Sequence, residues 1–226
     1  MDISREELAK MIDHSLLKPN LSQADTIAGI ETALRYDVAA VTVMPYLVPL
    51  TAEMVRDSGV LVDTVVGFPH GNETAATKAF QAHESVQLGA QEVDMVINIS
   101  ALISGEYDLV GEDIAAVVEA SKGATVKVIL ETAYLTDEQK VQACKLADEA
   151  GADFVKTSTG FAPTGFTVED LELMRRSVRE HVQIKAAQGV RSYADALVVR
   201  AAGATRFGCT RTAKIIAEWE AAHPEG

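Results

Sequence analysis

The chain has few of the residues from which metal centres and disulfide frameworks are built. It contains only two cysteines, Cys144 and Cys209, and no C-x-x-C spacing. Its five histidines are scattered, without the paired spacing of a helical zinc site. We therefore expect reduced thiols and no structural or catalytic metal.

Basic residues are also fewer than acidic residues. The 226 residues include 20 lysines and arginines against 33 aspartates and glutamates, which gives a formal net charge of −13. This balance disfavours nucleic acid and anionic membranes as partners and favours a small-molecule substrate. No apolar run approaches the roughly 18 residues of a membrane span, and residues 1–10 are acidic and amphipathic, unlike a secretory leader. We expect a cytoplasmic protein.

The motifs that hold nucleotide phosphates are missing as well. No G-x-G-x-x-G follows an early strand, and no G-x-x-x-x-G-K-S/T occurs anywhere. An open doubly wound sheet that binds a nucleotide is therefore the weaker of two fold hypotheses.

Eight short apolar runs predict β-strands. They lie at residues 11–13, 39–44, 61–68, 92–99, 125–131, 153–158, 182–187 and 205–209. Between them we expect helices, one capped by Ser22 and others at 72–88, 137–150 and 192–202. Apolar strands that alternate with helices are typical of a covered parallel sheet. With no linker present, eight such units predict one (β/α)8 TIM barrel domain, 1–226, with a short N-terminal helix.

Two lysines stand in near-identical surroundings. Lys156 and Lys185 each follow a short apolar run and precede small residues and a glycine, which predicts a lysine near the end of a buried strand. Burial disfavours the ammonium and a neighbouring cation disfavours it further, so one lysine of the pair can be a neutral amine nucleophile. If Asp94 joins them in the barrel, its carboxylate can move protons, and the three groups make a Schiff-base lyase. The alternative is that both lysines reach out to solvent and Asp94 is a rim charge.

A phosphate-binding site is expected at the same end of the barrel. Barrels of this kind often bind phosphate with backbone amides of the loops after the last strands, where glycine allows close approach and arginine forks onto phosphate oxygens. His70 is a further loop candidate, although such a histidine is more often solvated. The candidate substrate-binding residues are Asp13, Glu131, Thr159, Gly160, Gly189, Arg191, Gly208, Thr210 and Arg211.

Five segments resemble deoxyribose-phosphate aldolases, a family of class I aldolases. They are IDHSLLKP at 12–19, GFPHGN at 67–72, EVDMVIN at 92–98, VILET at 128–132 and FVKTSTGF at 154–161. The resemblance implies a barrel that reversibly cleaves 2-deoxy-D-ribose 5-phosphate to acetaldehyde and D-glyceraldehyde 3-phosphate without metal or organic cofactor. It also implies that Lys156 forms the Schiff base, that Lys185 lowers its pKa, and that Asp94 relays protons. A homodimer is expected by family analogy and base rate.

The sequence departs from the family pattern at three places. Gln188 replaces the first glycine of the usual Lys-x-x-Gly-Gly-x-Arg segment, and Thr210-Arg211 replaces a paired serine. Both changes fall in the expected phosphate site, where the charge of Arg211 can compensate. Thr42 stands where many relatives have cysteine, so we expect better tolerance of high acetaldehyde.

Three alternative functions remain open at this point. A Schiff-base aldolase for another sugar phosphate would differ in its cleavage products. A non-catalytic barrel that binds sugar phosphates is disfavoured by the joint presence of Lys156, Lys185 and Asp94. A phosphate-binding isomerase of the same fold would need a glutamate base but no imine.

Overall fold

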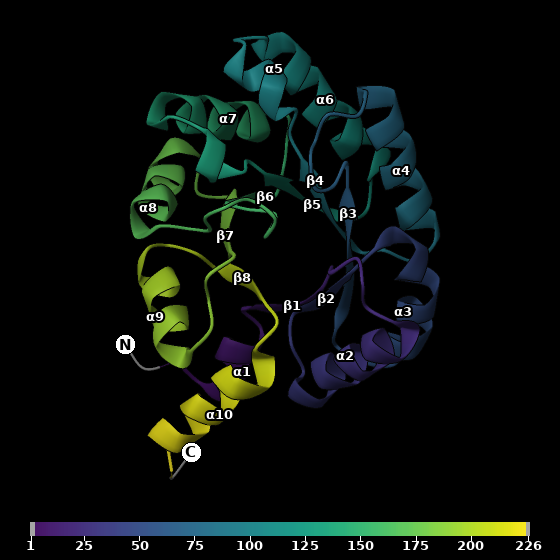
Figure 1. Ribbon diagram of the computed structural model, residues 1–226, viewed down its shortest axis with the longest axis vertical. Coiled ribbons are helices and arrows are strands. Elements are labelled where there is room, and N and C mark those ends of the chain that lie inside the picture. Colours follow the sequence, from purple (N-terminus) through teal and green to yellow (C-terminus); the bar gives the residue numbers. More distant parts are fainter. Residues whose placement is uncertain (1–2, 225–226) are drawn as a thin grey trace.

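The computed structural model describes residues 3–224 and shows a closed barrel of eight parallel strands in the order β1 to β8. Helices form a ring around these strands (Figure 1). The predicted (β/α)8 barrel is therefore confirmed, and the open sheet is wrong. The strands are β1 (Ile12–Leu16), β2 (Ala40–Val43), β3 (Leu61–Val66), β4 (Glu92–Val96), β5 (Thr125–Ile129), β6 (Phe154–Lys156), β7 (Gln183–Ala187) and β8 (Arg206–Cys209).

The helices follow the strands in alternation, and a short helix precedes the first strand. They are α1 (Arg5–Ala9), α2 (Gln23–Tyr36), α3 (Val48–Val55), α4 (Ala75–Gln87), α5 (Ile99–Ile103), α6 (Tyr107–Ala120), α7 (Asp137–Glu149), α8 (Val168–Ser177), α9 (Tyr193–Ala201) and α10 (Thr212–Ala222). None of the helices in residues 3–224 has the length and apolar character needed to cross a membrane.

Side-chain caps fix where several helices begin. Ser22 accepts a hydrogen bond from the amide of Asp25 at the start of α2, as the sequence predicts. Thr136 and Gln139 form a reciprocal capping box at the start of α7. The expected helix at 72–88 begins later, because the Thr74 side chain caps α4 by accepting from Thr77.

Four predicted strands, β3 to β6, end two or three residues earlier than the apolar pattern suggests, and the first strand, expected at 11–13, runs instead from Ile12 to Leu16. Two of these early ends shape the site. The strand expected at 92–99 stops at Val96 because Asn98 caps α5 with its side chain. The strand expected at 125–131 stops at Ile129, and Glu131 takes a left-handed backbone conformation, with φ 56°. Both residues thereby enter loops at the carboxyl end of the barrel, where TIM barrels carry their active sites.

Register and alternation place charged side chains inside the barrel. Lys156 pairs with Lys185 across β6 and β7, and Asp94 pairs with Lys127 across β4 and β5. Their sequence neighbours Val93, Val126 and Val155 belong to the apolar core outside the sheet. Because successive strand residues face opposite sides, the charged residues face the lumen.

Candidate active site

The three residues predicted to form a catalytic group meet in the lumen. Lys156 Nζ donates a hydrogen bond to Asp94 Oδ2 at 2.6 Å, and Lys185 Nζ donates to the same oxygen at 2.7 Å. The three side chains are 3%, 1% and 0% exposed for Lys156, Lys185 and Asp94. The alternative in which the lysines extend into solvent is therefore wrong.

The surroundings give the two lysines opposite proton affinities. Burial lowers the pKa of Lys156, and the nearby Lys185 lowers it further against the pull of Asp94. Burial also works against the charge of Lys185, but Asp13 and Asp94 outweigh it and raise its pKa. Asp94 is kept ionised, because Lys127, Lys156 and Lys185 outweigh its burial and hold its pKa well below the usual value. Lys156 is thus the amine that can act as a nucleophile.

Lys127 is a third lysine in the lumen, and the sequence reasoning missed it. Its Nζ lies 2.7 Å from Glu92 Oε2, 2.8 Å from Asp94 Oδ1 and 3.0 Å from Asp63 Oδ1. The signal was present, since Lys127 stands among β-branched residues in a predicted strand just as Lys156 does.

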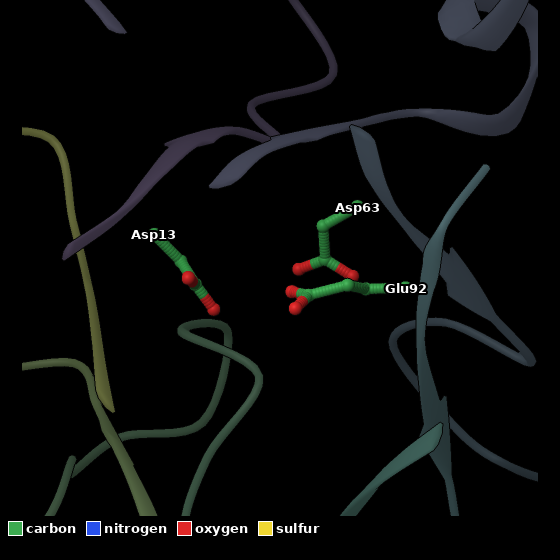
Figure 2. A group of neighbouring side chains, drawn as sticks. All are labelled: Asp13, Asp63 and Glu92. Carbon is green, nitrogen blue, oxygen red and sulfur yellow. The ribbon is translucent and has the colours of Figure 1, made fainter. Parts of the chain in front are cut away.

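Three lumen carboxylates come close enough together to suggest a metal site. Asp13, Asp63 and Glu92 point toward one another from β1, β3 and β4, with ligand oxygens within 4.8 Å (Figure 2). Lys127 Nζ lies within 3.9 Å of all three. The guanidinium of Arg206 also pairs with Asp13 and Glu92. The protein's own cations neutralise this cluster, so we interpret it as an ion-pair network.

A cavity of about 220 Å³ gives access to the amine of Lys156. We call it the amine cavity. Thr159, Gly160 and Gly208 line it, as expected for substrate-binding residues, and so does Gln188. Lys18 also lines it and adds a positive charge that the sequence reasoning did not assign to the site. A cavity with a nucleophilic amine and a second cation suits an anionic aldehyde.

A second cavity of about 310 Å³ adjoins the first and shares Thr159 and Phe161 with it. We call it the rim cavity. Glu131 lines it and accepts a hydrogen bond from the Thr159 amide at 3.1 Å. Burial raises the pKa of Glu131. His70 lines the same cavity, and the Phe68 ring meets Phe161 edge-on, with centroids 5.5 Å apart.

The remaining predicted residues lie elsewhere. Thr210 and Arg211 line a separate cavity, together with His14 and Lys214. The Arg191 side chain is exposed, and its backbone amide donates to Asp195.

Two more of the predicted substrate-binding residues stay away from the amine cavity. Gly189 packs against the Phe166 ring, where a Cβ atom would come within 2.8 Å. Asp13 is buried in the lumen against Lys185 and Arg206. Substrate contacts of these residues, and of Thr210, Arg191 and Arg211, stay predictions from sequence.

Comparison with known proteins places this geometry in a family. The model of the DeoC/LacD family aldolases matches residues 8–212. The chain is 52% identical over 216 residues to a deoxyribose-phosphate aldolase of Caldanaerobacter subterraneus, covering 94% of each protein. It is 52% identical to that of Streptococcus sanguinis over 215 residues, 95% of this chain and 98% of the relative. The solved deoxyribose phosphate aldolase of Aeropyrum pernix, described as tetrameric, has a TM-score of 0.90 at 28% identity, covering 97% of this chain and 93% of its own.

Proposed function

Because the chain belongs to the DeoC/LacD aldolase family, we propose that it cleaves 2-deoxy-D-ribose 5-phosphate to acetaldehyde and D-glyceraldehyde 3-phosphate, reversibly, through a Schiff base on Lys156. One observation carries the choice of Lys156. It is the lysine of the lumen whose pKa is lowered, and its side chain lines the amine cavity. An amine nucleophile requires both an unprotonated nitrogen and access for the aldehyde.

The lumen geometry supports each step of this chemistry. The Lys156 nitrogen adds to the substrate aldehyde, and loss of water leaves an iminium that withdraws electrons from the carbon–carbon bond to be broken. The proton of the neighbouring hydroxyl passes to the pair formed by Asp94 and Lys185, and that carbon becomes the aldehyde of the departing three-carbon product. The remaining enamine is protonated at carbon, and water then releases acetaldehyde and regenerates the amine. The protein supplies the electron sink itself, so the proposal needs no metal or organic cofactor.

The amine cavity holds both ends of the substrate in this proposal, and the rim cavity contributes contacts to its hydroxyls. The aldehyde end enters the amine cavity next to Lys156. The phosphate binds near the Lys18 ammonium and the backbone of Gly160 and Gly208. Thr159 lines both cavities, and its hydrogen-bond partner Glu131 lines the rim cavity. In the proposal both side chains form hydrogen bonds with substrate hydroxyls.

The proposal extends to the setting of the enzyme. We propose a cytoplasmic homodimer that acts on small sugar phosphates and free aldehydes and binds neither nucleic acid nor membrane. The net charge of −13 supports the last point, because such a surface repels polyanions.

The substrate assignment is tested by the cleavage products. Incubation with 2-deoxy-D-ribose 5-phosphate is expected to release acetaldehyde, and Lys156→Met is expected to lower kcat by roughly a thousandfold or more. Lys145→Met, which alters an exposed lysine of α7, is the matched control and should retain full activity. Cleavage of fructose 1,6-bisphosphate without any two-carbon product would instead assign the barrel to another sugar phosphate. Absence of turnover on every phosphorylated sugar would favour a binding protein.

A further inference from the structure

Asp63 is a buried carboxyl that the mechanism above does not use. It lies on β3 with no exposed surface. Its Oδ2 accepts a hydrogen bond from Thr42 Oγ1 at 2.8 Å and a longer one from Lys185 Nζ at 3.3 Å. Its Oδ1 receives no hydrogen bond among residues 3–224, although Lys127 Nζ lies 3.0 Å away. A buried carboxyl oxygen without a donor is suited to carry a proton of its own.

The net charge of the lumen gives a physical reason for a proton on Asp63. The connected ion pairs join four carboxylates to four cations. The carboxylates are Asp13, Asp63, Glu92 and Asp94, and the cations are Lys127, Lys156, Lys185 and Arg206. The network is neutral when all eight are ionised. If Lys156 becomes a neutral amine, one buried negative charge is left uncompensated, which is unfavourable in a site without solvent.

We propose that Asp63 is a positioning residue that holds a proton while Lys156 is a neutral amine and gives it up when the Schiff base forms. The inference rests on the proposed function, because it requires an iminium on Lys156. In both states the network then carries no net charge. Asp63 acts through Lys127, whose Nζ lies 3.0 Å from Asp63 Oδ1 and donates to Asp94 Oδ1 at 2.8 Å, and through Asp94, which accepts from Lys156.

The protons balance along this chain. Addition of the amine to the carbonyl forms the carbon–nitrogen bond, and the carbonyl oxygen leaves as water. That water takes one proton from the amine and one from the network, while the iminium nitrogen keeps the other amine proton. Lys127 passes a proton toward Asp94 as it accepts the one from Asp63 Oδ1, so its own charge does not change. Hydrolysis of the imine returns the proton to Asp63.

The surroundings of Asp63 favour such a reversible proton. Burial raises the pKa of Asp63 to about 6, and the charges of Asp94 and Asp13 act in the same direction against Lys127 and Lys185. Glu92 also faces it across the cluster in Figure 2. The opposing view is that Asp63 is a permanently ionised partner of Lys127 and Lys185. It predicts no change in protonation when substrate binds.

Infrared difference spectroscopy separates the two views. At about pH 6, where a carboxyl with a pKa of about 6 is about half protonated, addition of acetaldehyde to the wild-type enzyme should remove the carbonyl stretch of the protonated Asp63 as the imine forms. Asp63→Asn should lack this signal and should slow cleavage at least tenfold, because the iminium loses its counter-charge. Asp153→Asn, an exposed carboxyl at the other end of the strand that carries Lys156, is the matched control and should keep both the signal and the rate.

Thr42→Val keeps the test decisive if Asp63→Asn does not fold. It removes the hydroxyl that donates to Asp63 Oδ2, so the carboxyl signal should shift in frequency but still disappear with imine formation. Borohydride reduction and mass mapping report in parallel whether the imine is on Lys156. An imine on Lys156 without loss of a carboxyl signal overturns the role of Asp63 alone. No imine on Lys156 overturns the proposed function.

Discussion

The pKa of each lumen lysine follows the number of carboxylates that it contacts. Among residues 3–224, Lys156 forms an ion pair with Asp94 alone. Lys185 pairs with three carboxylates and Lys127 with four. All three are buried to a similar extent, so the penalty of burial is comparable and the carboxylates decide which lysine loses its proton. A nucleophilic lysine is thus selected by having the fewest partners.

Phosphate recognition gives the first prediction at the scale of single residues. The sequence predicts that Arg211→Ala raises KM for the phosphorylated substrate, but Arg211 lines a different cavity from Lys156. Lys18 shares the amine cavity with Lys156. Lys18→Met should therefore raise KM for 2-deoxy-D-ribose 5-phosphate roughly tenfold with little effect on kcat, because the variant loses one charge-assisted contact to the phosphate. Arg211→Ala should leave KM unchanged. Steady-state kinetics of both variants measure these effects. A raised KM in Arg211→Ala with an unchanged KM in Lys18→Met would place Arg211, and not Lys18, in the phosphate site.

Sequence reasoning located the candidate catalytic residues more reliably than the residues around them. Lys156, Lys185 and Asp94 were recognisable because ionisable groups near the ends of apolar strands are costly and must have partners. Asp63 and Lys127 lie in equally apolar strands, and several of the side chains that hold them come from other strands of the barrel. Pairing across a closed barrel depends on strand register, which composition and periodicity do not specify.

At the scale of elements, the loops set the shape of the cavities. The eight strands were predictable from apolar runs, but the turn after each strand was not. Gly71, in the loop between β3 and α4, lies very close to the loop that follows β4. A Cβ atom added to Gly71 would lie 1.9 Å from the Ile97 carbonyl oxygen. His70 and Asn72, on either side of Gly71, line the rim cavity. The close approach therefore fixes one wall of the candidate site.

Gly71→Ala tests the importance of that wall. The variant should lose more than about 3 kcal/mol of stability and should raise KM, because the loop must move away from Ile97. Gly105→Ala is a matched control, since Gly105 also has positive φ but no atom lies within 4 Å of its added Cβ. It should lose only about 1 kcal/mol, the cost of the left-handed backbone, with KM unchanged. Chemical denaturation and steady-state kinetics measure both effects, and equal losses in the two variants would rule out the close approach as the cause.

At the scale of the whole molecule, the barrel encloses charge within an apolar shell. Apolar residues pack between the sheet and the helices, while the ion pairs lie in the lumen that the strands enclose. The fold class was predictable because eight strand and helix units without a linker leave few other arrangements. The extent of the charged lumen, beyond Lys156, Lys185 and Asp94, was not predictable, because barrel interiors are more often filled by branched apolar side chains.

The stability of the barrel should fall in mild acid because of His14. Burial lowers the pKa of His14 to about 4, while its unfolded value is near 6.5, and its Nδ1 lies 2.8 Å from Thr212 Oγ1. The unfolded chain therefore binds a proton that the folded chain refuses, and stability is lost as pH falls from about 6.5 toward about 4. At about pH 5 this loss amounts to about 2 kcal/mol.

The matched variant is His14→Gln, which can keep the hydrogen bond to Thr212 but has no titrating group. Urea unfolding at about pH 7.5 and about pH 5 should show a larger loss for the wild type than for the variant. Asp63 contributes in the opposite direction, because its raised pKa makes the folded state bind a proton more tightly than the unfolded state between about pH 4 and about pH 6. Both proteins contain Asp63, so its contribution cancels when the variant is compared with the wild type. Parallel losses in the two proteins would show that His14 is not the acid-sensitive group.

The central claim is that one particular nitrogen in the lumen forms the covalent intermediate. Sodium borohydride added during turnover of 2-deoxy-D-ribose 5-phosphate, followed by peptide mass mapping, measures this directly. We predict a reduced adduct on Lys156, with Lys127 and Lys185 unmodified. An active enzyme that carries the adduct on either of the other two lysines, or on none of the three, would contradict the assignment.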